Sequence, residues 1–162
     1  MILGRERIFE RVREDRLIEE FMGDCLEGAG YDLRVGRIYK VGGGGYIGVS
    51  GRDNPAVGEV RFDEYPLEPG EYILFETVER VNMPGDLVGR ILPRSSVFRA
   101  GCSLMNAVVD PGYEGTLTLG LRNLSRHVFR FERGARMAQI VFEEVAGKTK
   151  PYEGRYQGGK VV

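Results

Sequence analysis

Short runs of β-forming residues, each ended by glycine, proline, asparagine or aspartate, recur along most of this 162-residue chain. The runs are YDLRV, YIGV, GEVRF, YILFETVERV, LVGRIL, SLMNAVV, TLTLGL, HVFRF and RMAQIVF. Strands this short and this regularly interrupted are typical of sandwiches and barrels, whereas βαβ units need a helix between strands. The pattern therefore predicts an all-β fold.

The first residues differ from this pattern. Between residues 5 and 22, apolar side chains recur at near-helical spacing and predict a short amphipathic helix or a pair of turns. These side chains are Ile8, Phe9, Val12, Leu17, Ile18 and Phe21. No other segment predicts a helix of convincing length.

Composition excludes several function classes. The net charge of −1 gives no overall attraction to nucleic acid or to an anionic membrane, so any phosphate site must be built locally. No apolar run approaches the ~20 residues of a membrane span. The N-terminal residues are too densely charged for a signal peptide. We therefore expect a cytoplasmic protein with neither a nucleic-acid nor a membrane partner.

The cysteines and the histidine indicate no metal or redox chemistry. Cys25 and Cys102 are too few for a structural zinc site and their spacing fits no redox motif. We interpret them as buried or idle thiols. The single histidine, His127, alternates with aromatic residues on a predicted strand, where a structural role is favoured over a catalytic one.

Two glycine-rich segments remain. Residues 42–45 are four glycines without the Lys-Ser/Thr and the following helix of a phosphate loop, so they predict only a mobile turn. The end of the chain, KTKPYEGRYQGGKVV, is polar and glycine-rich but carries two tyrosines. It is either a frayed tail or an arm that closes over a ligand, and the tyrosines favour the arm.

Three stretches place reactive side chains beside tight turns: residues 30–33, 93–96 and 109–115. Arg94 offers a planar fork of donors suited to phosphate oxygens, and Ser95 and Ser96 add hydroxyl groups. Asp110 can orient and deprotonate a water, and Asp32 can hold a magnesium-bound water. Each stretch alone has an ordinary explanation as a turn or a solvated charge, but together they indicate a phosphate site with a water nucleophile.

These stretches resemble the motifs of the dUTPase and dCTP deaminase superfamily. GYDL at 30–33 is similar to the first dUTPase motif and PRSS at 93–96 to the second. AVVDPGYEG at 107–115 resembles the third, and GARMAQ at 134–139 the fourth. The resemblance extends from about residue 24 to 159, and the order of four motifs makes it specific.

The resemblance implies a distorted jelly roll, that is, a β-sandwich of the dUTPase-like β-clip type with a short N-terminal helix. It further implies a homotrimer with active sites between subunits, and Mg²⁺ on the triphosphate of the substrate. We accordingly expect a β domain over residues 1–147 and a flexible arm over residues 148–162 that closes over the active site.

The resemblance also assigns roles to individual residues. Asp110 would activate the water that attacks the α-phosphorus, and Asp32 would act in the outer shell of the metal through water. Tyr113 would pack against the deoxyribose, and the hairpin from Leu104 to Val109 would read the pyrimidine edge. The expected substrate-binding residues are Arg94, Ser95, Ser96, Arg99, Asn106, Tyr113, Gln139, Tyr152, Arg155 and Tyr156.

Within the superfamily the sequence resembles both activities. Asp-Pro-Gly at 110–112, Arg99 and the tail YEGRYQGG are similar to dCTP deaminases. Deaminases, however, carry a general acid/base glutamate ten residues after the aspartate of the third motif, where this chain has Gly120. Alternation in TLTLGLR places Gly120 on the face opposite Leu117, Leu119 and Leu121, so that no side chain there moves protons.

The sequence thus predicts a dUTP diphosphatase, which converts dUTP to dUMP and pyrophosphate and resembles archaeal dUTPases. Two alternatives stay open. One is a dCTP deaminase, and the other is a catalytically silent nucleotide-binding regulatory module on the same fold. The joint presence of Asp110, Arg94, Ser95 and Gln139 argues against the silent module, because a sensor needs no water-activating carboxylate.

Overall fold

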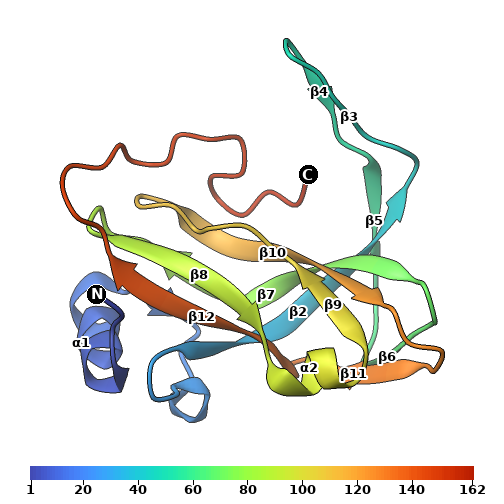
Figure 1. Ribbon diagram of the computed structural model, residues 1–162, viewed down its shortest axis with the longest axis horizontal. Coiled ribbons are helices and arrows are strands. Elements are labelled where there is room, and N and C mark those ends of the chain that lie inside the picture. Colours follow the sequence, from blue (N-terminus) through green and yellow to red (C-terminus); the bar gives the residue numbers. More distant parts are fainter.

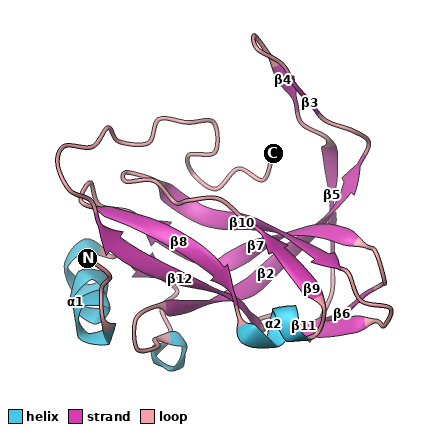
Figure 2. Ribbon diagram, viewed as in Figure 1, coloured by secondary structure: helices cyan, strands magenta, loops and turns pink.

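The computed structural model of the protein describes residues 1–162 and consists mainly of β-strands (Figure 1; Figure 2). The helical elements are α1 (Arg5–Asp15), the 3-10 helix η1 (Gly23–Cys25) and α2 (Ser95–Arg99). The first strands are β1 (Ile18–Glu19), β2 (Tyr31–Gly42), β3 (Tyr46–Ile47), β4 (Arg52–Asp53), β5 (Ala56–Val60) and β6 (Glu64–Leu67). The others are β7 (Tyr72–Asn82), β8 (Leu87–Pro93), β9 (Cys102–Met105), β10 (Glu114–Asn123), β11 (Phe129–Glu132) and β12 (Arg136–Glu144).

One large sheet organises the molecule. Its strands follow the order β8-β12-β2-β7-β10-β9, with β1 paired to β7 and β5 to β2. Val109, shortly after β9, forms a bridge with Gly89 in β8, so the two ends of this order approach each other. The sheet is therefore a nearly closed barrel, and the prediction of an all-β, dUTPase-like fold is confirmed.

The core lies inside this sheet and follows the alternation of the strands. On β10, Leu119 and Leu121 are buried, and they pair with Phe75 and Ile73 of β7. The apolar residues of the predicted strands supply most of a single buried cluster of 31 residues. At about 25 cal/mol for each Å² of apolar surface removed from water, this cluster is the main stabilising contribution.

The N-terminal helix is confirmed but is shorter than the apolar spacing suggests. It ends at Asp15, because the next residue, Arg16, adopts a left-handed conformation with φ of 55°. Ile18 then pairs with Val81 of β7, so the later apolar residues belong to the sheet instead of the helix. Arg11 fixes the helix to the body through two hydrogen bonds to Asp86, of 2.8 and 2.9 Å.

One local prediction was wrong, and two short elements were not predicted. PRSS opens one of these, the five-residue helix α2. His127 is exposed in a turn before β11 instead of lying on the strand. Strand β6 was missed because Pro66 interrupts it, and proline is tolerated there because β6 pairs with β11 alone, at the edge of a two-stranded sheet.

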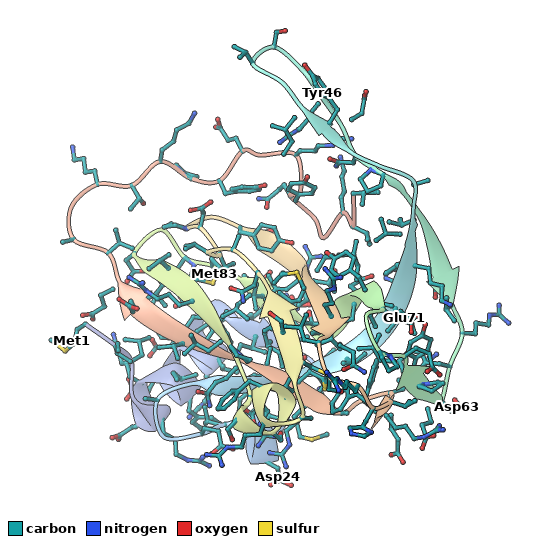
Figure 3. The ribbon with its side chains drawn as sticks, turned by 45° about the vertical axis from the view of Figure 1, so that its right-hand side comes forward. Met1, Asp24, Tyr46, Asp63, Glu71 and Met83 are labelled. Carbon is teal, nitrogen blue, oxygen red and sulfur yellow. The ribbon has the colours of Figure 1, made fainter.

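Two segments extend from the barrel. The glycine run leads into the hairpin β3–β4, which projects away from the body with Tyr46 near its far end (Figure 1; Figure 3). The last residues form an irregular arm that crosses the same end of the molecule (Figure 1). Cys25 and Cys102 are buried and free, as predicted. No helix has the length and apolar character required to cross a membrane.

Candidate functional site

The predicted water-activating residue, Asp110, lies on a tight turn. The amide N–H of Tyr113 donates to the carbonyl of Asp110 over 3.2 Å, and Gly112 has φ of 81°. Proline followed by a left-handed glycine is the sequence of a type II turn, so Asp-Pro-Gly-Tyr dictates the conformation locally. The turn leaves the Asp110 side chain exposed and without a hydrogen bond to protein.

Asp110 borders a cavity of about 490 Å³ that we call the Asp110 cavity. Its walls come from β7, β10, the segment after β9 and the C-terminal arm, and most of the residues are apolar. Asn106, Asp110, Tyr113, Tyr152 and Tyr156, all predicted from sequence, line it. This is the form of a small-molecule site, an apolar pocket with few polar groups.

Gly120 also lines the Asp110 cavity. The side chain of Tyr72 occupies the space next to it. A Cβ atom on Gly120 would stand 2.7 Å from the Tyr72 hydroxyl oxygen and 2.9 Å from a ring carbon. The position of the deaminase glutamate therefore has no carboxylate, and a side chain there would have to displace the Tyr72 ring.

Tyr113 forms the side of the cavity near the turn. It is mostly buried, its hydroxyl donates to the carbonyl of Thr116 over 2.5 Å, and burial raises its pKa to about 12. The ring of Tyr152, from the arm, meets the Tyr113 ring edge to face at 5.5 Å between centroids. The phenol is therefore neutral at physiological pH and presents a rigid aromatic surface.

Glycine residues allow the C-terminal arm to pack closely against the Asp110 turn. A Cβ on Gly112 would stand 2.9 Å from Cβ of Pro151, so only glycine permits the approach. The amide N–H of Tyr152 donates to the carbonyl of Pro111, and that of Gly158 to the carbonyl of Glu114, each over 2.8 Å. These backbone hydrogen bonds hold the arm across the mouth of the Asp110 cavity.

The projecting hairpin holds the outer part of the arm. Asn54 donates a hydrogen bond of 3.2 Å to the hydroxyl of Tyr156, and the guanidinium of Arg52 lies 5.9 Å from the centre of the same ring. Arg155, the third predicted arm residue, is exposed and lines neither this cavity nor the one described next.

A second cavity, of about 420 Å³, contains the other predicted residues. We call it the Arg94 cavity. Asp32 comes from β2, Arg94 and Ser95 from the end of β8 and the start of α2, and Gln139 from β12. The pairing of Gln139 with Asp32 and with Leu92 brings these strands together. Its lining is mainly polar and charged, in contrast to the Asp110 cavity.

Asp32 is the buried anion of the Arg94 cavity, with 1% of its side chain exposed. Its Oδ2 lies 3.0 Å from Nε of Arg94 and 3.6 Å from Arg136, but neither contact has hydrogen-bond geometry. Gln139 donates weakly to Oδ1 over 3.5 Å. Burial raises the pKa of the Asp32 carboxyl above its ordinary value, although the positive charge of Arg94 opposes the shift.

The two cavities share no lining residue within one chain. Val109 pairs with Gly89 near the beginning of β8, whereas Arg94 follows its last residue. Five residues of extended strand separate Gly89 from Arg94, which corresponds to about 16 Å. The structure thus brings together the first, second and fourth motifs, but not the third.

Some predicted residues lie beside these cavities, and some lining residues were missed. Ser96 and Arg99 lie on α2 but line neither cavity, and Arg99 is over the ring of Phe98. Tyr72 and Thr118 line the Asp110 cavity without having been predicted. Their alternation along β7 and β10 was visible in the sequence, but the register that brings Tyr72 over Gly120 was not.

Comparison with known protein families and relatives gives a consistent result. The profile of the family described as dCTP deaminase-like matches residues 2–145. A dCTP deaminase of Thermococcus kodakarensis is 39% identical over 93% of this chain and 90% of its own. A probable deoxyuridine 5'-triphosphate nucleotidohydrolase of Aeropyrum pernix is also 39% identical, over 83% of this chain and 86% of its own.

Solved structures support the fold. The 2'-deoxycytidine 5'-triphosphate deaminase of Agrobacterium tumefaciens superimposes with a TM-score of 0.70 and 21% identity over 87% of this chain. This chain spans about half of that protein, 47% of its length. A native EIAV dUTPase gives a TM-score of 0.54 at 16% identity, over 86% of this chain and 92% of its own.

Proposed function

The chain belongs to the dUTPase/dCTP deaminase superfamily, whose members are nucleotide-metabolising enzymes, and from that premise we propose that it hydrolyses dUTP to dUMP and pyrophosphate. The observation that carries the proposal is the presence of Asp110 and Gly120 in one cavity. Hydrolysis at phosphorus needs a base, which Asp110 supplies. Deamination needs an acid/base group next to the pyrimidine ring, and Gly120 supplies none.

In the proposed reaction, the Asp110 carboxylate accepts a proton from water while the water oxygen forms a bond to the α-phosphorus. The bond from the α-phosphorus to the bridging oxygen breaks, and pyrophosphate leaves with the electron pair. The exposed carboxylate of Asp110, which has no partner in the protein, is free to orient that water. Tyr113 packs against the deoxyribose, and Asn106 lies in the segment that reads the base.

The Arg94 cavity is proposed to bind the phosphates. The planar guanidinium of Arg94, the hydroxyl of Ser95 and the amide of Gln139 are donors of the kind that neutralise and orient phosphate oxygens. Ser96 and Arg99 extend this donor surface on α2. Gly89, which pairs with the neighbour of Asp110, lies about 16 Å of strand from Arg94, so we propose that one substrate contacts Asp110 and Arg94 from different subunits. A homotrimer with sites between subunits satisfies this requirement.

The residues fit Mg²⁺ bound mainly by the substrate. The protein has no cluster of three or more His, Cys, Asp or Glu side chains that could hold a metal by themselves. The orphaned, buried Oδ2 of Asp32 instead fits an acceptor for a metal-bound water. Magnesium typically keeps several waters and binds phosphates, and it would neutralise the charge that develops on the triphosphate.

The arm is proposed to close the site. Tyr152, Arg155 and Tyr156 are the side chains assigned to covering the substrate, and two of them already line the Asp110 cavity. Closure excludes bulk water, which strengthens the electrostatic interactions inside. The proposed enzyme acts in the cytoplasm, where it removes dUTP from the nucleotide pool and supplies dUMP.

A dCTP deaminase is the second candidate, favoured by the names of several relatives. To distinguish the two candidate activities, the purified protein is incubated with dUTP or dCTP and Mg²⁺. The products are then resolved by chromatography, and ammonia is assayed. We expect pyrophosphate and dUMP from dUTP, no ammonia from dCTP, and loss of dUTP turnover in excess EDTA that Mg²⁺ restores. Ammonia from dCTP would establish deamination, and nucleotide binding without turnover would establish a silent module.

A further inference from the structure

Two hydroxyl groups at the Gly120 end of the Asp110 cavity have no partner in the protein. Tyr72 begins β7 and lines the cavity, with 38% of the residue exposed, and its hydroxyl makes no hydrogen bond to the protein. Thr118 lines the cavity from β10, and its Oγ1 is shut off from solvent with no hydrogen-bond partner. An unpaired buried hydroxyl such as that of Thr118 is costly, so its presence in a cavity wall points to a ligand.

Gly120 is what allows Tyr72 to occupy this position. Tyr72 pairs with Arg122 and Leu74 pairs with Gly120, so Tyr72 and Gly120 belong to the same face of the sheet. A Cβ on Gly120 would stand 2.7 Å from the Tyr72 hydroxyl and 3.2 Å from Cβ of Met105. Any side chain at position 120 would therefore displace the Tyr72 ring.

The surroundings of these hydroxyls are apolar. Leu74, Met105 and Leu119 line the same end of the cavity. Polar groups placed singly in an apolar pocket fix the orientation of a ligand. A pyrimidine presents one such edge, which carries an acceptor oxygen at position 4 in uracil and a donor amino group in cytosine.

We propose that Tyr72 is the specificity-determining residue of the Asp110 cavity, an inference that rests on the proposed dUTP site. The hydroxyls of Tyr72 and Thr118 bind the 4-position edge of the pyrimidine. The phenol donates to the uracil oxygen. Facing the cytosine amino group, the same phenol must accept instead. A phenol is a weaker acceptor than donor, because its oxygen lone pair is delocalised into the ring, so the uracil nucleotide is favoured.

The first test compares Tyr72→Phe with Tyr65→Phe. Both remove a phenol hydroxyl, but that of Tyr65 donates to Glu71 over 2.6 Å and lies outside the cavity. The dissociation constants of α,β-imido-dUTP and of dCTP are measured by calorimetry with Mg²⁺. We expect Tyr72→Phe to weaken α,β-imido-dUTP about tenfold and dCTP less, without lowering the unfolding temperature. Tyr65→Phe should lower the unfolding temperature and leave both constants unchanged.

The second test removes a threonine hydroxyl inside and outside the cavity. Thr77 is satisfied, because its hydroxyl donates to the carbonyl of Glu79 over 2.7 Å and accepts from the N–H of Leu117 over 2.9 Å. Thr77→Val should lower stability without changing nucleotide affinity. Thr118→Val should weaken nucleotide binding without lowering stability. It removes a hydroxyl that is unpaired in the protein but bonds to the ligand.

Equal affinities of Tyr72→Phe and the parent for α,β-imido-dUTP would overturn this assignment, as would an equal loss for both nucleotides. If the parent protein still releases pyrophosphate from dUTP, either of these results leaves the proposed function intact. A parent that binds dCTP and α,β-imido-dUTP but hydrolyses neither natural nucleotide refutes the proposed function alone. A parent that binds neither ligand refutes both.

Discussion

The two cavities of this protein are built from different chemistry. The Asp110 cavity is lined mostly by apolar and aromatic residues and carries one exposed carboxylate. The Arg94 cavity is mostly polar, and its buried carboxylate, Asp32, already lies against Arg94. The first suits a sugar and a base beside a water, and the second suits phosphates. Neither alone has the groups needed to cleave a nucleoside triphosphate.

In the proposed reaction, each cavity contributes a different part of the site. Residues of the first, second and fourth motifs meet because β2, β8 and β12 are neighbours in the sheet. The third motif follows β9, at the other end of the strand order, and joins β8 only through Val109 and Gly89. In the proposed enzyme, a complete site therefore requires a second copy of the chain.

The largest effect is expected from Asp110→Asn. The amide keeps the shape of the side chain but loses the basic oxygen, so kcat for dUTP should fall by ~10²–10⁴-fold while α,β-imido-dUTP still binds. Asp63→Asn is the control, since Asp63 is also an exposed aspartate and lies far from the arm (Figure 3). If Asp110→Asn kept the parent kcat, another group would have to be the base.

Mixing variants tests the division between subunits. Arg94→Ala alone should abolish most activity, because the phosphates lose their charged donor. If sites join the Asp110 cavity of one chain to the Arg94 cavity of another, exchange with Asp110→Asn chains should restore activity in about one quarter of the sites. Native mass spectrometry confirms the exchange. Verified mixed oligomers without activity would show that each site lies within one chain.

Removal of residues 152–162 should have a smaller effect. None of these residues is fully buried, so the barrel should remain folded, with an unchanged far-UV circular dichroism spectrum. The mouth of the Asp110 cavity would lose Tyr152 and Tyr156, and kcat/KM for dUTP should fall on the order of 10²-fold. Full activity of the truncated protein would mean that the arm is no lid, and loss of folding would mean that it is part of the barrel.

The sequence predicted those features that depend on local pattern. Punctuated runs identified the strands because alternation and turn residues are local signals, and β6 was missed where Pro66 disturbed them. Likewise, apolar spacing extended the helix to residue 22, because Leu17 and Ile18 are buried by the sheet and not by the helix. Local spacing does not distinguish which partner buries a residue.

Many residues that line the two cavities were predicted from the sequence, but Tyr72, Thr118 and the arrangement of the cavities were not. The turn at Asp110 and the alternation that exposes Gly120 to the cavity follow from nearby residues. The placement of Tyr72 over Gly120 depends on the register of β7 and β10, and the separation of the two cavities depends on the strand order. Both are set by contacts between residues distant in sequence, which a single sequence does not display.

The smallest expected effect concerns the buried carboxylate of the Arg94 cavity. Burial raises the pKa of Asp32 above its ordinary value of 3.8, so the folded state holds its proton more tightly than the unfolded chain. The stability that this group contributes is therefore complete below pH 3.8 and is lost as the pH rises through the raised pKa. Asp32→Asn, which cannot ionise, should lack this loss.

Thermal unfolding of the two proteins between pH 3 and pH 7 would measure this difference. We expect Asp32→Asn to gain a small amount of stability relative to the parent as the pH rises, because Arg94 partly compensates the charge of the parent's carboxylate. The variant should nevertheless bind α,β-imido-dUTP more weakly in the presence of Mg²⁺, since the acceptor for the metal-bound water is weakened. A variant that is less stable than the parent at pH 7 would show that the ion pair with Arg94 outweighs the burial of Asp32, and that this cavity is built for stability instead of for phosphate.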